Sequence, residues 1–401
     1  MARAAGPRQR GSIGEVFAAF LKLGLTSFGG PVAHLGYFRS EFVQRRGWLD
    51  DASYTDLVAL CQFLPGPASS QVGMALGLGR AGWAGALAAW LAFTLPSAAA
   101  MVLFALGVTQ WNTLASSGAL HGLKMAAVAV VAQAVLAMTR SLCPDRPRAG
   151  IAVVAALGAL AVPGALGQVG AIVLGALAGH LLVPGAPAAS GPSLDYGVSR
   201  RVGTALLLTY VALLVALPIV AVTAGTMVPA AIAVFYQAGA LVFGGGHVIL
   251  PLLQAGVVPP GWIDNDVFLA GYAAAQAVPG PLTTFAAFLG AVMPAPLGGW
   301  GGAALLLVVI FLPAFLVVAG ALPFWEALRL RPAARRAMAG VNAAVVGLLA
   351  AALYDPLWTS AIRTPADFGV ALAAFGLLTI GRVTPVLVVI GAAVAGMALA
   401  A

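Results

Sequence analysis

Apolar residues fill the chain in successive runs, which short polar, glycine-rich or proline-rich turns separate. A helical run of about 20 such residues matches the ~30 Å hydrocarbon core of a bilayer. The runs lack the apolar–polar alternation of barrel strands, and only helices or a closed barrel satisfy their backbone polar groups in lipid. The pattern therefore predicts an all-α polytopic membrane protein whose surroundings are the lipid bilayer.

Thirteen membrane segments are expected from these runs, arranged as two sets of six around a lone segment. The last two segments of each set are short, so whether they cross fully stays open. The first set covers 14–37, 52–78, 83–108, 118–139, 150–163 and 166–184. The lone segment covers 202–222, and the second set covers 228–252, 264–293, 299–324, 336–353, 366–380 and 383–400.

The two sets repeat one another in sequence. "SFGGPVAHL" (27–35) matches "VFGGGHVIL" (242–250), and 47–70 matches 261–284 through a shared Pro-Gly-Pro motif. An odd number of segments precedes the second copy, so the copies should lie in inverted orientation, as in many secondary transporters. Trp83 and Pro96 correspond to Trp300 and Pro313, and 122–131 corresponds to 340–349. The expected organisation is a first repeat at 1–190, a linker and extra helix at 191–227, and a second repeat at 228–401.

A Pro-Gly-Pro motif interrupts one apolar segment of each repeat, at 65–67 and at 279–281. Each proline removes a backbone donor and clashes with the carbonyl four residues back, so it should split the helix into two half-helices. The second half-helix begins near Ser69 or Thr283, where unpaired N–H groups and the positive dipole end favour an anion. The alternative is a kink that only shapes packing, which two motifs in register make the weaker interpretation.

Composition and charge agree with a membrane protein. Hydrophobic residues make up 61% of the chain and charged residues 8%, with mean hydropathy +1.00, whereas a soluble domain carries about a quarter charged residues. With the N-terminus cytoplasmic, fourteen arginines fall on inside segments and four outside, which predicts a C-terminus outside. The net charge of +8 is thus mainly a topology signal, and nucleic acid is not an expected partner.

The segment 38–50 is the exception to this charge pattern, because it places Arg39, Arg45 and Arg46 on the expected outside. Two interpretations stay open. The segment forms an interfacial amphipathic stretch, or it attracts anions near a mouth of the protein.

Charged residues within the apolar segments are functional candidates, because a charge at the bilayer centre costs about 2.5–3.5 kcal/mol on insertion scales. Lys22 and Lys124 are the only lysines, and each falls in a membrane segment. Lys22 could instead pair with a nearby acid such as Asp56, and Lys124 could extend to an interface. Asp56 either forms an ion pair or takes up a proton during transport.

Polar groups near the motifs complete the expected substrate site. The Phe-Gly-Gly motifs allow close backbone approach or another helix interruption, although glycines also mediate helix packing in membranes. Hydroxyl and amide groups beside the Pro-Gly-Pro motifs can donate hydrogen bonds. His34 is grouped with Asp56 for proton coupling or an ion pair; either histidine beside the Phe-Gly-Gly motifs could also be a packing residue. The expected substrate-binding residues are Lys22, Ser27, Gly29, Gly30, Gln62, Pro65, Gly66, Pro67, Ser69, Ser70, Lys124, Gly244, Gly245, His247, Gln276, Pro279, Gly280, Pro281, Thr283, Thr284 and Asn342.

Neither a metal centre nor catalytic chemistry is indicated by the sequence. Cys61 and Cys143 lie far apart, without Cys or His neighbours at ligand spacing. An intramembrane enzyme would need a nucleophile with a histidine or paired acids near it, and no such spacing occurs. No metal, cofactor or catalytic residue is therefore expected.

The runs "LKLGLTSFGGPVAHLGYF" and "LCQFLPGPASSQ" of the first half, with "FGGGHVILPLL" and "QAVPGPLTTF" of the second, resemble the chromate ion transporter family. The resemblance covers nearly the whole chain and is closest to the long, two-domain members. It implies two fused homologous halves in opposite orientation, located in the bacterial inner membrane. It also implies export of chromate, a tetrahedral dianion like sulfate. The expected mechanism is alternating access coupled to the proton motive force, which would confer chromate resistance. A sulfate or other oxyanion carrier and a lipid-linked phosphate translocase are the alternatives, and a homodimer stays open.

Overall fold

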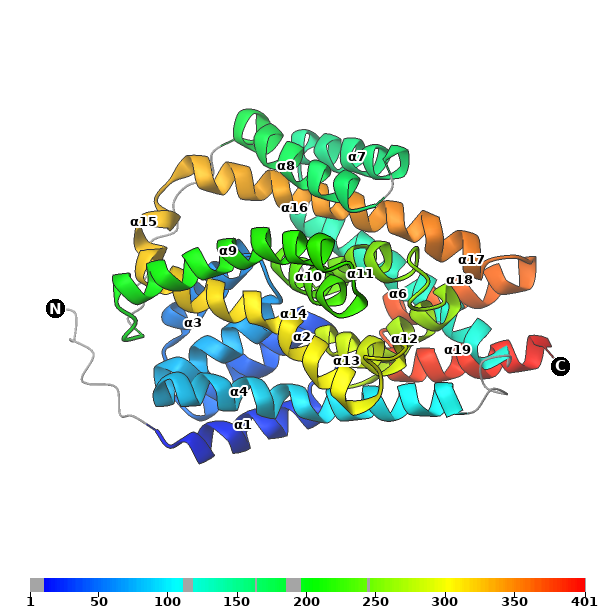
Figure 1. Ribbon diagram of the computed structural model, residues 1–401, viewed down its shortest axis with the longest axis horizontal. Helices are drawn as coiled ribbons and strands as arrows, with labels where there is room; N and C mark the ends of the chain where they lie inside the picture. The colour runs from blue at the N-terminus through cyan, green and yellow to red at the C-terminus, as the bar shows by residue number, and fades with distance from the viewer. Residues whose placement is uncertain (1–10, 111–117, 163, 185–195, 244–245, 401) are drawn as a thin grey trace.

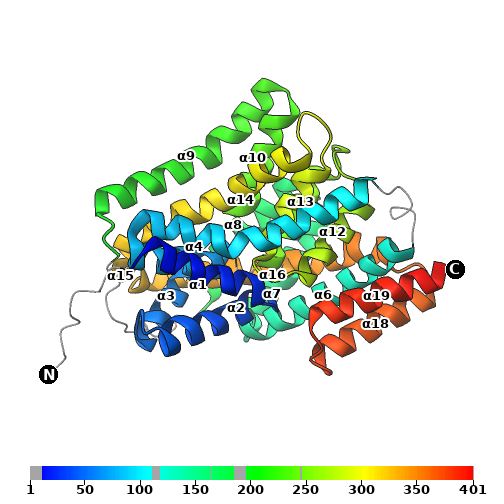
Figure 2. The same cartoon turned by 90° about the horizontal axis from the view of Figure 1, so that it is seen from below.

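The computed structural model describes residues 11–110, 118–162, 164–184, 196–243 and 246–400. Those residues form helices, turns and loops, with no strand among them. The molecule is elongated, and most helices run roughly along its long axis (Figures 1 and 2). The expected all-α class is confirmed for the described residues.

The first half and the extra helix contain eight α-helices and one π-helical turn among the described residues. They are α1 (Ile13–Thr26), α2 (Gly30–Phe38), the π-helical turn η1 (Arg39–Arg45), α3 (Asp51–Phe63), α4 (Ala68–Gln110), α6 (Gly118–Leu142), α7 (Arg146–Ala161), α8 (Ala165–Leu182) and α9 (Arg200–Ala224). α4 consists of two helices that meet at a sharp kink, because Ala81 and Gly82 leave helical geometry and Gly77 lies against the Gly85 backbone. The expected segment 83–108 is thus its second part.

The described residues of the second half form α-helices, short 3-10 helices and one π-helical turn. They are α10 (Met227–Ala240), η2 (Gly246–Val248), α11 (Ile249–Val257), α12 (Asn265–Ala277), η3 (Leu282–Thr284), α13 (Phe285–Val292), α14 (Gly299–Ala321), η4 (Leu322–Phe324), α15 (Trp325–Arg329), α16 (Pro332–Ala352), η5 (Leu353–Trp358), α17 (Thr359–Ala361), α18 (Pro365–Thr379) and α19 (Pro385–Ala400).

The helices that lead to the two Pro-Gly-Pro motifs begin in the same way. Asp50 caps α3 by accepting a hydrogen bond from the Ser53 N–H at 2.7 Å. Asp264 caps α12 by accepting from the Asp266 N–H at the same distance. A side-chain oxygen at this position satisfies one of the free N–H groups of the first helical turn. The Gly-Trp-x-Asp sequence, at 47–50 and again at 261–264, therefore determines where both helices start.

Several expected membrane segments are pairs of short helices. α1 and α2 divide 14–37, α3 and the first part of α4 divide 52–78, and α12 and α13 divide 264–293. Five of the described helices are long and apolar enough to cross a membrane by length and composition. They are Ala68–Val108, Gly118–Leu142, Arg200–Ala224, Gly299–Leu328 and Pro332–Ala361. Shorter apolar helices make up most of the remainder.

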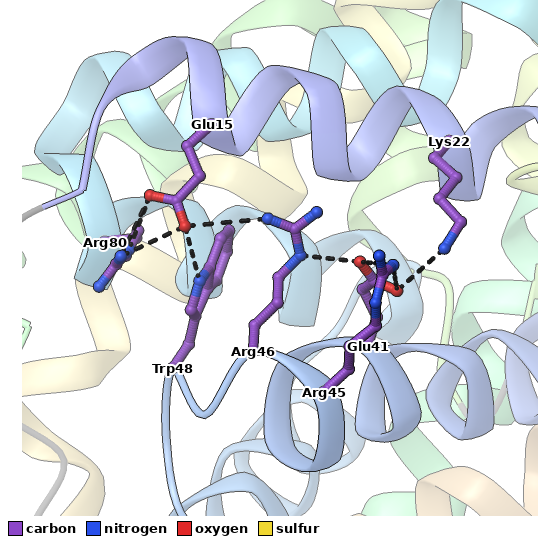
Figure 3. Close-up of polar contacts among 7 residues, drawn as sticks. All are labelled: Glu15, Lys22, Glu41, Arg45, Arg46, Trp48 and Arg80. Carbon is purple, nitrogen blue, oxygen red and sulfur yellow. Dashed lines mark hydrogen bonds and ion pairs between the residues drawn. The ribbon is translucent and has the colours of Figure 1, made fainter.

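The segment 14–37 does not carry the chain to the opposite end of the molecule, which corrects the expectation for the arginine cluster. Arg46, after η1, lies 3.8 Å from Glu15 in the first turn of α1, and Arg80 lies 3.1 Å from the same carboxylate. The Trp48 indole also donates to Glu15 at 3.1 Å (Figure 3). α1 and α2 therefore form a hairpin that returns to the end from which it started.

The long helices α6 and α16 each pack against helices of the other half. α6 contacts α18 and α19, whereas α16 contacts α7 and α8 (Figure 1). Gly122 on α6 lies directly against the Ala392 backbone, and Gly340 on α16 lies against the Gly175 backbone. A side chain at either glycine would collide with main-chain atoms, so close backbone contact holds these crossings together.

Candidate site at the two helix breaks

The two Pro-Gly-Pro breaks are connected crosswise by backbone hydrogen bonds. The Gly66 N–H donates to the Val242 carbonyl at 2.6 Å, and the Gly280 N–H donates to the Ser27 carbonyl at 3.0 Å. Val242 and Ser27 each come directly before a Phe-Gly-Gly motif. Each Pro-Gly-Pro motif therefore touches the Phe-Gly-Gly region of the other half.

Both central glycines have a backbone conformation that other residues adopt only with strain. Gly66 has φ +124° and Gly280 has φ +103°. A Cβ at Gly66 would lie 3.2 Å from the Ala314 Cβ, and one at Gly280 would lie 2.8 Å from the Ser97 Oγ. Ala314 and Ser97 each follow a proline inside a long helix, Pro313 of α14 or Pro96 of α4. The breaks thus pack against equivalent points of the two long helices.

His34 connects both motifs of the first half. Its Nε2 lies 3.2 Å from the Ser27 carbonyl, and its Nδ1 lies 3.5 Å from the Ser69 Oγ. A carbonyl only accepts hydrogen bonds, so the Nε2 atom carries the proton. His34 is 1% exposed, and Ser27 and Ser69 are also buried. The expected histidine therefore lies at the site, where it positions the two serines.

The corresponding region of the second half uses different partners. The His247 Nδ1 lies 2.8 Å from the Tyr272 hydroxyl, and the Thr284 hydroxyl donates to the Pro281 carbonyl at 2.9 Å. Tyr272 was not singled out from the sequence, because one tyrosine in an apolar helix resembles ordinary packing. Gly244 and Gly245, expected at the site, lie outside the described residues.

Several buried polar atoms around the breaks have no hydrogen-bond partner among the described residues. A buried polar group without a partner costs about 1–3 kcal/mol, so such atoms mark places where a polar ligand or water fits. Most of them are donors or hydroxyls that can donate. They include Ser27 Oγ, Ser70 Oγ, Gln71 Oε1, Thr94 Oγ1 and Gln276 Nε2.

The two lysines lie in ion pairs rather than among these atoms. Lys22 is 53% exposed and its Nζ lies 3.2 Å from Glu41, so its partner is not Asp56 as considered from the sequence. Lys124 is buried and its Nζ lies 2.9 Å from Asp266 at the start of α12. The Asp56 carboxylate accepts a hydrogen bond from the Trp325 indole at 3.0 Å.

Gln62 and Asn342, two further expected site residues, make no side-chain hydrogen bond with either helix break among the described residues. Gln62 is exposed on α3. Asn342 lies on α16, and its Oδ1 is buried without a partner. Within the described ranges, no three His, Cys, Asp or Glu side chains gather in a group that could hold a metal ion.

Glu41 is the centre of a charged network at the end of the molecule where α1 begins (Figure 3). It is 6% exposed and pairs with Lys22, Arg45 and Arg46 at 3.2, 3.0 and 2.7 Å. Burial opposes its ionisation, but hydrogen bonds from the three cations outweigh burial and lower the pKa of Glu41 to about 2. This segment was expected to be interfacial or anion-attracting, and two of its arginines are engaged by this acid.

We expect Glu41→Gln to lower stability, because three cations would lose their shared counter-charge. Charged hydrogen bonds contribute about 1.5–3 kcal/mol each, so the melting temperature in detergent should fall by several degrees. Asp51→Asn is the control, since the Arg39–Asp51 pair is about half exposed on both sides and, screened by solvent, should contribute little to stability. Equal melting temperatures for the two variants would contradict the central role of Glu41.

These features define a polytopic helical membrane protein in which broken helices from two halves meet in a buried, polar centre. The chromate transporter family profile matches residues 14–180 and 229–397, and the chain belongs to this family. It is 32% identical to a chromate transport protein of Pseudomonas aeruginosa, over 95% of this chain and 91% of that protein.

Two other relatives agree with this assignment. A probable chromate transport protein of Synechococcus elongatus is 30% identical over 85% of this chain and 84% of its own. A chromate transport protein of Cupriavidus metallidurans is 26% identical over 94% and 91%. No solved structure gave a significant match. The relatives are named as transporters, in agreement with the expectation that this chain is not an enzyme.

Proposed function

We propose that this protein is a secondary transporter that exports chromate from the bacterial cytoplasm by alternating access, coupled to the proton motive force, and so confers chromate resistance. One observation carries the proposal. The crossed hydrogen bonds Gly66–Val242 and Gly280–Ser27 bring both helix breaks to one buried place that is rich in unpartnered polar atoms. A substrate site between repeats, built from broken helices, is the arrangement that alternating access uses.

The halves 1–190 and 228–401 are proposed as inverted repeats, joined by 191–227 and related by a two-fold axis in the membrane plane. The crossed bonds support this, because Gly66 and Gly280 are equivalent in the two repeats, and each donates to the residue before the Phe-Gly-Gly motif of the other repeat. The packing of α6 on α18 and α19, and of α16 on α7 and α8, supports it in the same way. The family profile also matches the chain twice, once in each half.

The proposed anion site consists mainly of neutral side-chain donors. Ser69, Ser70, Thr283 and Thr284 are buried at the starts of the half-helices, and Gln276 has a free amide nitrogen. The Gly66 and Gly280 N–H groups are already bonded to carbonyls, so they hold the breaks together in this conformation. Hydroxyl and amide donors suit the oxygens of a tetrahedral dianion such as chromate.

The proposed orientation places the N-terminus in the cytoplasm and the C-terminus outside. The arginine distribution supports it more strongly once Arg45 and Arg46 are assigned to the end where α1 begins. Those residues were exceptions to the positive-inside pattern, and their contacts with Glu41 and Glu15 remove the conflict.

The test is chromate uptake by everted membrane vesicles, in which export from the cytoplasm appears as accumulation. We expect saturable uptake that falls when the proton gradient is collapsed. Vesicles from cells with the empty vector are the control. Uptake of sulfate that added chromate does not inhibit would instead favour a sulfate carrier. Absence of uptake of both anions, with the protein present in the membrane, would refute the proposal.

A further inference from the structure

Three polar side chains form a row along α4. Trp90, Thr94 and Ser97 have the spacing i, i+4 and i+7, which places them on one face of a helix. The row begins beside α14, where the Trp90 and Phe311 ring centroids are 5.7 Å apart. It ends at the second break, where Ser97 packs directly against Gly280. The row therefore leads along α4 to the proposed anion site.

Thr94 differs from six other threonines that lie within helices of this chain. A threonine inside a helix usually bonds the carbonyl four residues back. Among the residues that the structure describes, the Thr94 hydroxyl has no partner, although Thr94 is 1% exposed. Threonines that do make the i−4 bond are Thr26, Thr55, Thr204, Thr209, Thr223 and Thr379.

A second donor on this face of α4 also lacks a described partner, whereas Ser97 is bonded. The Trp90 Nε1 is buried with no partner in the described part of the chain, and an indole nitrogen can only donate. The Ser97 hydroxyl donates to the Thr94 carbonyl at 3.0 Å, so it fixes the local helix rather than satisfying the Thr94 side chain. Beyond Gly280, the Ser27 hydroxyl is also buried and unpartnered.

The row occurs in one half only. With Pro96 matched to Pro313, the equivalents of Trp90, Thr94 and Ser97 are Leu307, Phe311 and Ala314. The equivalent face of α14 therefore has no side-chain donor. A requirement of the fold would be expected in both halves, so the one-sided donors indicate a role in binding.

We propose that Trp90 and Thr94 bind the transported tetrahedral oxyanion, with the indole N–H and the threonine O–H donating to its oxygens. This inference rests on the proposed function and adds two specificity-determining residues on α4. Neutral donors suit a transported ion, because binding must be strong enough to collect the anion and weak enough to release it. The N–H and O–H bonds of these side chains also have fixed directions toward the anion, whereas the flexible side chain of a lysine does not.

The test compares Thr94→Val, which keeps the shape and removes the hydroxyl, with Thr94→Ser, which keeps the hydroxyl. We expect Thr94→Val to raise the KM for chromate uptake about tenfold or more, with a smaller effect on the maximal rate, and Thr94→Ser to stay near wild type. Trp90→Phe should behave like Thr94→Val. Thr223→Val is the control, since that hydroxyl bonds its own helix.

A second measurement separates this inference from the proposed function. The melting temperature of the purified protein is recorded with chromate, sulfate and phosphate. Stabilisation of the wild type that Thr94→Val loses supports the binding role even if vesicles show no transport. An unchanged KM in Thr94→Val, or an equal loss in Thr94→Ser, would overturn it. If no anion is either transported or stabilising in the wild type, both proposals fail.

Discussion

Gly280→Ala is expected to abolish chromate transport, although it adds only one methyl group. At φ +103° an L-residue is strained, typically by about 1–2 kcal/mol. The new Cβ would also lie 2.8 Å from the Ser97 Oγ and 3.2 Å from the Phe93 carbonyl oxygen. Relief of these contacts would move the Gly280 N–H from the Ser27 carbonyl and separate the breaks. Initial rates in everted vesicles, over a chromate concentration series at matched abundance, measure the loss.

Two comparisons make this expectation specific. Gly301→Ala should leave transport unchanged, because no atom lies within 4 Å of a Cβ at that position and its φ is ordinary. Thr283→Ala should weaken apparent affinity by at most about tenfold, since it removes one neutral donor. If Thr283→Ala lost all transport while Gly280→Ala retained it, the glycine contacts would not be what holds the site.

Asp266→Ala is expected to be the most destabilising single change among the ion pairs. Its partner Lys124 is 3% exposed, so removal of the acid leaves a buried charge without compensation. Breaking a fully buried pair from one side typically costs about 3–5 kcal/mol, and the cost here should be smaller, because Asp266 is 46% exposed. The protein should therefore show a sharply lower melting temperature and reduced membrane abundance in Asp266→Ala.

The double variant Lys124→Met/Asp266→Asn separates the stability of this pair from transport. Both charges are then absent, and the methionine stem fills a similar space, so abundance and melting temperature should recover. If Lys124 also contributes to anion binding, as proposed from the sequence, chromate transport should stay low in the recovered protein. Full transport in the double variant would assign the lysine to structure alone.

The positions of the helix breaks could be predicted from the sequence, because proline acts locally. Pro65, Pro67, Pro279 and Pro281 remove donors that any helix at those positions would need. α3 and α12 accordingly end at Phe63 and Ala277, just before the motifs. The crossed bonds between the halves could not be predicted, because they depend on how distant segments meet.

The return of the chain between α1 and α2 was missed for a physical reason. In lipid, both protein-facing and lipid-facing residues are apolar, so a run such as 14–37 has the length of a crossing whether it crosses or turns back. Gly29, with φ +101°, permits the turn. The sequence around Gly29 does not distinguish it from the many glycines that serve helix packing. The contact between Glu15 and Arg46 shows that the chain turns back, and a sequence pattern does not reveal such a contact.

The row on α4 was missed because isolated polar residues carry no pattern in an apolar helix. Thr94 and Ser97 are each compatible with a hydroxyl bonded to its own helix, which is their ordinary state in membranes. Only the three-dimensional structure shows that Ser97 bonds its own helix and that Thr94 has no bond to a described residue. Repeat comparison offered a signal, since Phe311 and Ala314 occupy the equivalent positions, but it does not show which half is unusual.

The exchange of partners between the halves sets an order for biosynthesis. α6 packs on α18 and α19, which emerge from the ribosome more than two hundred residues after it. Until then the Gly122 face of α6 has only lipid or other proteins beside it. We therefore expect the first half to complete its packing only after α18 and α19 have been synthesised, and a chain that stops after α9 to be cleared faster than the full chain.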